Sequence, residues 1–145
     1  MILYLDTSAL VKMFADEPGA LAVRSAVTAA DGCFTHLIAY AETRAAFAKA
    51  LRVGRETPAL LVEHKREFET FWKSLGVLVP DEGVVRRAGD LAEQFGLRGY
   101  DSVHLAAAEQ VYNAAGRPGA FALAAYDQRL LASAEALGLQ VLDHD

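Results

Sequence analysis

Short apolar runs that alternate with longer helical segments limit the fold of this 145-residue sequence more than any other feature. The runs lie at 2–5, 33–35, 77–79 and 120–125, and a last short run follows at 140–142. Strands that alternate with helices favour a parallel sheet with helices on both faces. We therefore predict an α/β fold in three layers, α/β/α, around a short central parallel sheet.

Glycine, proline and helix-capping residues divide the segments between these runs. They predict helices at 7–16, 20–29, 36–51, 58–74, 80–95, 101–116 and 127–137, and a turn at Pro118-Gly119. The segment 36–51 is apolar almost all round, which is typical of a buried helix. No repeat or linker interrupts the chain, so we expect a single domain over residues 1–145.

Composition excludes several classes of protein. Apolar residues make up 53% of the chain, which excludes a disordered tail. The single cysteine, Cys33, rules out an intramolecular disulfide and fits a reducing compartment. The first residues lack a basic leader and a cleavage site, and no apolar stretch approaches the roughly 18 residues of a membrane span. We expect a cytoplasmic protein with no membrane association.

The charge is unevenly distributed along the chain. The net charge of −5 argues against a nonspecific, basic nucleic-acid coat protein. Residues 44–87 nevertheless carry 9 Lys and Arg against 6 Asp and Glu, a net charge of +3. This part could guide a polyanion toward an acidic site. Taken one by one, these basic residues fit a solvated helical face better than this role.

Four carboxylates lie where a predicted strand passes into a helix, or inside that helix: Asp6, Glu42, Asp101 and Asp127. Ligands of parallel α/β sheets bind beyond the carboxyl ends of the strands, so the topology allows these acids to converge. A carboxylate in apolar surroundings must be paired, hydrogen-bonded, bound to a metal or neutralised. Because no Lys or Arg stands at the equivalent positions to pair with all four, we predict a metal site.

Each acid also has a structural interpretation. Asp6, Asp101 and Asp127 could cap the helices that follow them. Glu42 stands inside a helix, and residues two apart on a helix do not face each other, so Arg44 is not its partner. Glu42 therefore requires another partner.

Carboxylate oxygens favour Mg²⁺ or Mn²⁺ over Zn²⁺. Such ions activate water and stabilise the oxygens of a displacement at phosphorus. The phosphate-binding, dinucleotide-binding, serine-hydrolase and zinc-protease motifs are absent from the sequence. The histidines are scattered, at His36, His64, His104 and His144. His104, three residues after Asp101, could lie near the site, although a histidine in such a position more often packs in the core or supports a site from behind.

The segments L-D-T-S-A-L, A-E, Y-D-S-V-H-L-A-A-A and A-Y-D-Q-R-L, taken in order, resemble the PIN-domain family, and within it the VapC-type toxins. The resemblance implies a Rossmann-like PIN fold and a Mg²⁺- or Mn²⁺-dependent endoribonuclease. Asp6, Glu42 and Asp101 match the core acids of the family, and Asp127 matches a fourth, more variable acid. Ser8 matches a small hydroxyl residue that would orient Asp6 or a bound water.

The same resemblance implies partners. They are an RNA substrate, a second copy in a homodimer, and a cognate antitoxin of a type II pair. A C-terminal segment of the antitoxin would lie in or beside the acidic site, where an arginine could compete with the metal.

Two rival functions remain open. One is a protein-binding module that keeps the PIN fold without nuclease activity. The other is a phosphotransfer domain with Asp6 as nucleophile. The second lacks another Asp two residues after Asp6 and an obvious catalytic Lys.

Overall fold

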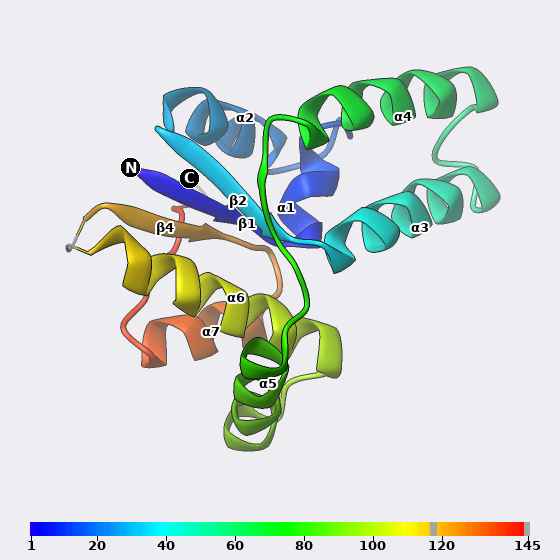
Figure 1. The fold of residues 1–145 in the computed structure, drawn as a ribbon. Coiled ribbons are helices and arrows are strands. Elements are labelled where there is room, and N and C mark those ends of the chain that lie inside the picture. The colour runs from blue at the N-terminus through cyan, green and yellow to red at the C-terminus, as the bar shows by residue number, and fades with distance from the viewer. Residues whose placement is uncertain (117–118, 144–145) are drawn as a thin grey trace.

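A parallel sheet with the strand order β3-β2-β1-β4 forms the centre of the described chain (Figure 1). The strands are β1 (Ile2–Leu5), β2 (Gly32–His36), β3 (Gly76–Leu78) and β4 (Phe121–Ala124). The structure is a computed structural model, and it describes residues 1–116 and 119–143. The chain leaves β1 for β2 and β3 on one side and returns to β4 on the other, so the order reverses between β1 and β4. Ligands of open α/β sheets bind at such a switch point.

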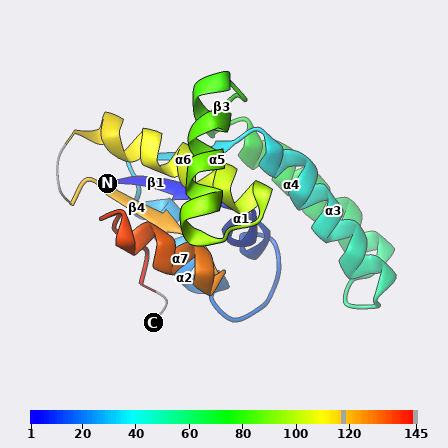
Figure 2. The ribbon, with the colours of Figure 1, turned by 90° about the horizontal axis from the view of Figure 1, so that it is seen from below.

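Helices cover both faces of this sheet. They are α1 (Thr7–Lys12), α2 (Ala20–Ala29), α3 (Ile38–Arg52), α4 (Pro58–Trp72), α5 (Glu82–Phe95), α6 (Gly99–Ala115) and α7 (Gln128–Ala136). α1 and α2 lie on one face, α6 and α7 lie on the other, and α5 packs on α6 (Figures 1 and 2). The predicted three-layer α/β/α arrangement is confirmed. In the described residues, no helix is both long and apolar enough to cross a membrane.

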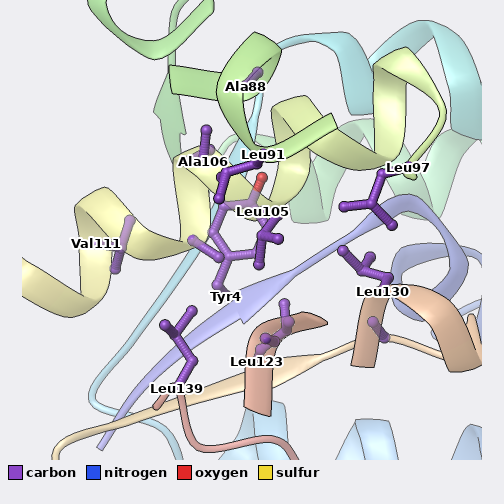
Figure 3. Close-up of a cluster of buried hydrophobic side chains, with 14 of the residues drawn as sticks. Tyr4, Ala88, Leu91, Leu97, Leu105, Ala106, Val111, Leu123, Leu130 and Leu139 are labelled. Carbon is purple, nitrogen blue, oxygen red and sulfur yellow. The ribbon is translucent and has the colours of Figure 1, made fainter. Parts of the chain in front are cut away.

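The alternating side chains of the strands build two apolar cores. Tyr4 and Leu123 point into the core under α5, α6 and α7, which Figure 3 shows in close-up. Leu3 and Leu5 point the opposite way, into the core under α1 and α2. Because successive strand residues face opposite sides, a sheet covered on both faces needs apolar residues at every position. The run Ile2–Leu5 meets this requirement.

The hairpin of α3 and α4 extends away from the sheet (Figures 1 and 2). Phe47 and Phe68 pack with Phe14 in an aromatic cluster that holds the hairpin to the segment after α1. The buried side chains of α3 are those of Ala39, Thr43 and Phe47. The expectation of a helix buried all round is therefore wrong. Among the helices, α3 packs mainly against α1 and α4, and its many alanines tolerate exposure.

The helix expected over 7–16 ends at Lys12. The chain tightens there into a turn, with the backbone N–H of Met13 bonded to the carbonyl of Leu10. Arg24 of α2 then donates to the carbonyl oxygens of Met13 and Ala15, both at 3.0 Å. A side chain from the next helix thus satisfies carbonyls that end the first one.

Other boundaries differ from the prediction as well. His36, expected to begin a helix, ends β2, and its Nδ1 accepts a hydrogen bond from the backbone N–H of Ile38. The strand expected at 140–142 is reduced to an isolated bridge between Val141 and Leu123. Of the expected turn at Pro118-Gly119, Pro118 lies outside the described residues, as does His144.

Candidate active site

One cavity of about 610 Å³, beyond the carboxyl ends of β1 and β4, collects all the predicted site residues. Its lining includes Asp6, Ser8, Glu42, Asp101 and Asp127, together with Thr7, Lys12, Glu17, Lys49, Arg98, His104 and Tyr126. A smaller hollow of about 360 Å³ is lined by Glu42, Arg98 and Asp101 as well, so it adjoins the first. The sequence showed only that these acids could converge, and the structure places them around one space.

Asp6 is a buried carboxylate at the junction of β1 and α1. Its side chain is 4% exposed. Oδ1 accepts the backbone N–H of Ala9 at 2.9 Å, which caps α1, and the hydroxyl of Ser8 at 2.6 Å. Burial raises the pKa of Asp6, and the charge of Asp101 adds to the rise, while electrostatic attraction to His104 and the hydrogen bonds from Ser8 and Ala9 oppose it. In the described chain no Lys or Arg forms an ion pair with Asp6, so its charge is expensive to maintain.

Ser8 links this carboxylate to the loop after β4. Its hydroxyl donates to Asp6 and accepts the backbone N–H of Tyr126 at 2.9 Å. Asp127 follows in that loop and caps α7, with Oδ1 accepting the backbone N–H of Leu130 at 2.9 Å. The capping interpretation therefore holds for Asp127, which lines the cavity as well.

Glu42 is the fifth residue of α3, two residues nearer its start than expected. Its Oε1 accepts the hydroxyl of Thr7 at 2.7 Å and lies 2.9 Å from Nε2 of His104. Burial raises the pKa of Glu42, but the hydrogen bonds from His104 and Thr7, together with electrostatic attraction to His104 and His36, outweigh burial, and the net shift is downward. Thr7 and His104 are the partners that the position of Glu42 required. Arg44 instead forms an ion pair with Glu69, across the α3–α4 hairpin.

Asp101 is the third residue of α6, because the helix begins at Gly99 rather than at 101. Its interpretation as a helix cap is therefore wrong. Oδ2 of Asp101 lies 3.3 Å from Nε of Arg98, whose side chain is 82% exposed. Such an exposed ion pair contributes little, on the order of 0–1 kcal/mol. Arg98 thus neutralises the charge of Asp101 only weakly.

The four acids present oxygen atoms suited to a hard cation. Within the described structure, each acid engages a single oxygen in hydrogen bonds or ion pairs: Oδ1 of Asp6, Oε1 of Glu42, Oδ2 of Asp101 and Oδ1 of Asp127. The second oxygen of each remains for another ligand. No three His, Cys, Asp or Glu side chains of the described residues form a ready-made metal cluster. A cation held here would complete its shell with water, as Mg²⁺ commonly does.

Three cationic side chains share the cavity wall: Lys12, Lys49 and Arg98. Of the basic residues between 44 and 73, Lys49 is the one in this lining. Lys12 donates to Glu17 at 3.0 Å and lies 4.4 Å above the ring of Tyr126. The acids thus outnumber the cations around this space, and Lys12 is already engaged by Glu17.

The sequence did not predict the contact of Tyr4 with His104 or the contact of Thr7 with Glu42. It left open whether His104 lies at the site. The sequence assigns no role to Thr7, whose hydroxyl donates to Glu42, while Asp6 caps α1. The signal for His104 was its spacing of three from Asp101, which places both on one face of α6. Tyr4 gave no signal, because it reads as one more apolar residue of β1.

Comparisons with known proteins agree with this geometry. The model of the PIN domain family matches residues 3–130. Ribonuclease VapC45 of Mycobacterium tuberculosis is 36% identical over 140 residues, which cover 97% of this chain and 94% of that protein. The crystal structure of PAE2754 from Pyrobaculum aerophilum superposes with a TM-score of 0.71 at 18% identity, over 98% of this chain and 84% of the other. A toxin–antitoxin complex from Klebsiella pneumoniae gives 0.62 at 15% identity, over 90% of each chain.

The structural likeness shows the fold, and the sequence match spans the segment that carries all four acids, from Asp6 to Asp127. A switch-point cavity lined by those acids and a family match over most of the chain lead to one assignment: this chain belongs to the PIN domain family.

Proposed function

We propose that this chain is a metal-dependent endoribonuclease that acts as the toxin of a type II toxin–antitoxin pair. One observation carries the proposal: Asp6, a buried carboxylate that forms no ion pair with a Lys or Arg of the described residues, shares a cavity with three further acids. The 36% identity to a ribonuclease over 97% of the chain supports the same activity. Residues 1–145 would act as one domain in the cytoplasm.

In this proposal Asp6, Glu42, Asp101 and Asp127 hold Mg²⁺ or Mn²⁺, some of them through water. The ion would supply activated water and charge stabilisation for hydrolysis of a phosphodiester. Ser8 fixes the carboxylate of Asp6 by the hydrogen bond described above. The acids exclude a bare phosphate from the cavity by charge, so RNA binding and metal binding are coupled.

The cationic side chains at the cavity wall suit the RNA backbone. Lys49 and Arg98 bring positive charge to the rim of an otherwise acidic space. Phosphate contacts of this kind supply affinity without sequence preference, and salt weakens them. We therefore place the scissile phosphate between the acids and this rim.

The partners follow from the family and its neighbours. We propose a homodimer and a cognate antitoxin, the latter supported by the toxin–antitoxin complex that shares the fold. A groove of about 770 Å³ between the segment after α1 and the α3–α4 hairpin adjoins the acid cavity and shares four lining residues with it, Val11, Glu17, Ala46 and Lys49. A segment seated there would end beside the acids.

The test is RNA cleavage with Mg²⁺ or Mn²⁺ by the wild type, Asp6→Asn and Asp101→Asn. Asp90→Asn, an exposed acid of α5 outside the cavity lining, is the matched control. We expect cleavage to be lost in the first two variants and kept in the control. Undiminished cleavage by both site variants would overturn the proposal. Tight binding of a partner without any metal binding would favour the protein-binding module, and a trapped phospho-aspartate at Asp6 would favour phosphotransfer.

A further inference from the structure

Two buried polar side chains have no place in the mechanism so far. His104 is 2% exposed and Tyr4 is fully buried. Nδ1 of His104 lies 2.8 Å from the hydroxyl oxygen of Tyr4, and Nε2 lies 2.9 Å from Oε1 of Glu42. Nε2 is also 3.1 Å from the hydroxyl of Thr7, which donates to the same oxygen of Glu42. The imidazole therefore connects the apolar core to the acid cavity.

The neighbours of the two ring nitrogens decide which nitrogen donates to Glu42. Tyr4 is buried among apolar side chains, with Leu91, Leu105 and Leu123 around it (Figure 3). Its hydroxyl lies 2.8 Å from Nδ1 of His104 and also has hydrogen bonds with Thr35 and the backbone of His36. The carboxylate of Glu42 can only accept, and its Oε1 lies 2.9 Å from Nε2, so Nε2 carries a proton and donates to Glu42.

A ring without a proton on Nε2 fits worse. A proton on Nδ1 alone would turn the lone pair of Nε2 toward the carboxylate of Glu42 at 2.9 Å. With Nε2 protonated, the ring donates to Glu42 while Nδ1 stays within hydrogen-bond distance of the Tyr4 hydroxyl.

We propose that Tyr4 and His104 form a hydrogen-bonded relay that positions Glu42 for metal binding. The inference rests on the proposed function. His104 is a positioning residue: it holds Oε1, together with Thr7, and leaves Oε2 for the cation. Hydrogen bonds behind a metal ligand typically change metal affinity by about 10–100-fold when they are removed. Asp101 and His104 lie one turn apart on α6, so the same helix carries one ligand and positions another.

The test compares four variants by Mn²⁺ binding, measured by calorimetry or electron paramagnetic resonance without RNA. His104→Leu removes the donor, and His104→Gln returns an N–H near the position of Nε2. Tyr4→Phe removes the hydroxyl that fixes the ring. Tyr112→Phe is the matched control, because Tyr112 packs on Phe121 at the edge of the same core and does not line the cavity.

We expect His104→Leu to weaken Mn²⁺ binding by about 10–100-fold. His104→Gln should recover most of this loss, Tyr4→Phe should show part of it, and Tyr112→Phe should bind as the wild type does. A purely structural role would not give recovery by glutamine. If the wild type binds Mn²⁺ and both Tyr4→Phe and His104→Leu bind it equally well, the relay is overturned while the proposed function stands.

A second measurement separates the relay from the proposed function. Long-range ¹H–¹⁵N correlation spectra of the metal-free wild type report which nitrogen of His104 carries the proton. A proton on Nε2 that is lost or redistributed in Tyr4→Phe supports the relay even if the wild type binds no Mn²⁺, which by itself would overturn the proposed function. A proton on Nδ1 with none on Nε2 overturns the relay. Tyr4→Phe also keeps the test valid if His104→Leu does not fold.

Discussion

Replacement of Asp6 by asparagine should stabilise the metal-free protein while it abolishes metal binding. Asparagine keeps the Oδ1 acceptor, and Asn and Asp are equally good helix caps. The substitution therefore preserves the bonds from Ser8 and Ala9 in geometry and removes the charge. Any change in stability then reports the cost of a buried carboxylate.

The size of the expected stability change follows from two opposing contributions to the free energy of unfolding. Burial of a carboxylate costs several kcal/mol. Two hydrogen bonds to a charged acceptor return about 1.5–3 kcal/mol each. Because the pKa of Asp6 is raised, the cost exceeds the return. A residual penalty on the order of 1 kcal/mol would raise the midpoint of thermal unfolding by about 3 °C in Asp6→Asn for a domain of this size.

The raised pKa of Asp6 determines how the stability difference between Asp6→Asn and the wild type depends on pH. The folded-state pKa of Asp6 lies above its unfolded value, so the folded state binds the proton more tightly. The penalty of the charge is complete above the folded pKa and disappears as the pH falls through it toward about 3.9, the unfolded value. The advantage of Asp6→Asn should be largest near pH 7.5 and should shrink toward pH 4. The lowered pKa of Glu42 affects both proteins alike and cancels in the difference.

The assay is thermal unfolding of both proteins in EDTA and in MgCl₂ or MnCl₂. At a metal concentration of 100 times the dissociation constant, the wild type should gain about 2.7 kcal/mol and become the more stable of the two. An Asp6→Asn variant that is less stable than the wild type in EDTA, with a difference independent of pH, would refute the reasoning. It would mean that Asp6 is stabilised as an ion without a metal.

Substitutions at three further positions test the fold. Asp127→Ala should lower the free energy of unfolding by about 1 kcal/mol because α7 loses its cap, whereas Asp127→Asn should not, and urea titration distinguishes them. Gly76→Ala should cost about 1–3 kcal/mol, because the added Cβ would lie 2.4 Å from the Phe34 ring. Gly89→Ala, inside α5 with no atom within 4 Å of the added Cβ, should instead stabilise by about 0.5–1 kcal/mol, and equal effects at the two glycines would contradict this account.

The sequence predicted the elements better than their pairing. A run such as Ile2–Leu5 shows in its own residues that both faces are buried, so β1 could be predicted locally. The strand order depends on contacts between residues far apart, such as Leu3 with Ala122, which no local pattern records. The bond between Tyr4 and His104 spans 100 positions and escaped prediction for the same reason.

The positions at which α6 and α7 begin explain the remaining differences between the predicted and the observed site. Asp101 and Asp127 both precede predicted helices, and the sequence offered the same two interpretations for each. α6 begins two residues earlier than expected, which moves Asp101 inside the first turn, whereas α7 begins at Gln128 and leaves Asp127 as its cap. A shift of two residues in the helix start thus decides which of the two acids caps a helix.

The choice between cap and metal ligand, which the sequence left open, is not exclusive in this fold. A carboxylate has two oxygens, and Asp6 and Asp127 each commit Oδ1 to a helix N-terminus while Oδ2 stays available. The cap fixes the rotamer, so the second oxygen is held in place without any ligand present. A rigid helix start thereby orients two acids, and hydrogen bonds from Thr7 and His104 do the same for Glu42, which has no cap to hold it. Asp101, whose one side-chain partner among the described residues is the exposed Arg98, is then the acid with the most freedom to adjust to an ion or a substrate.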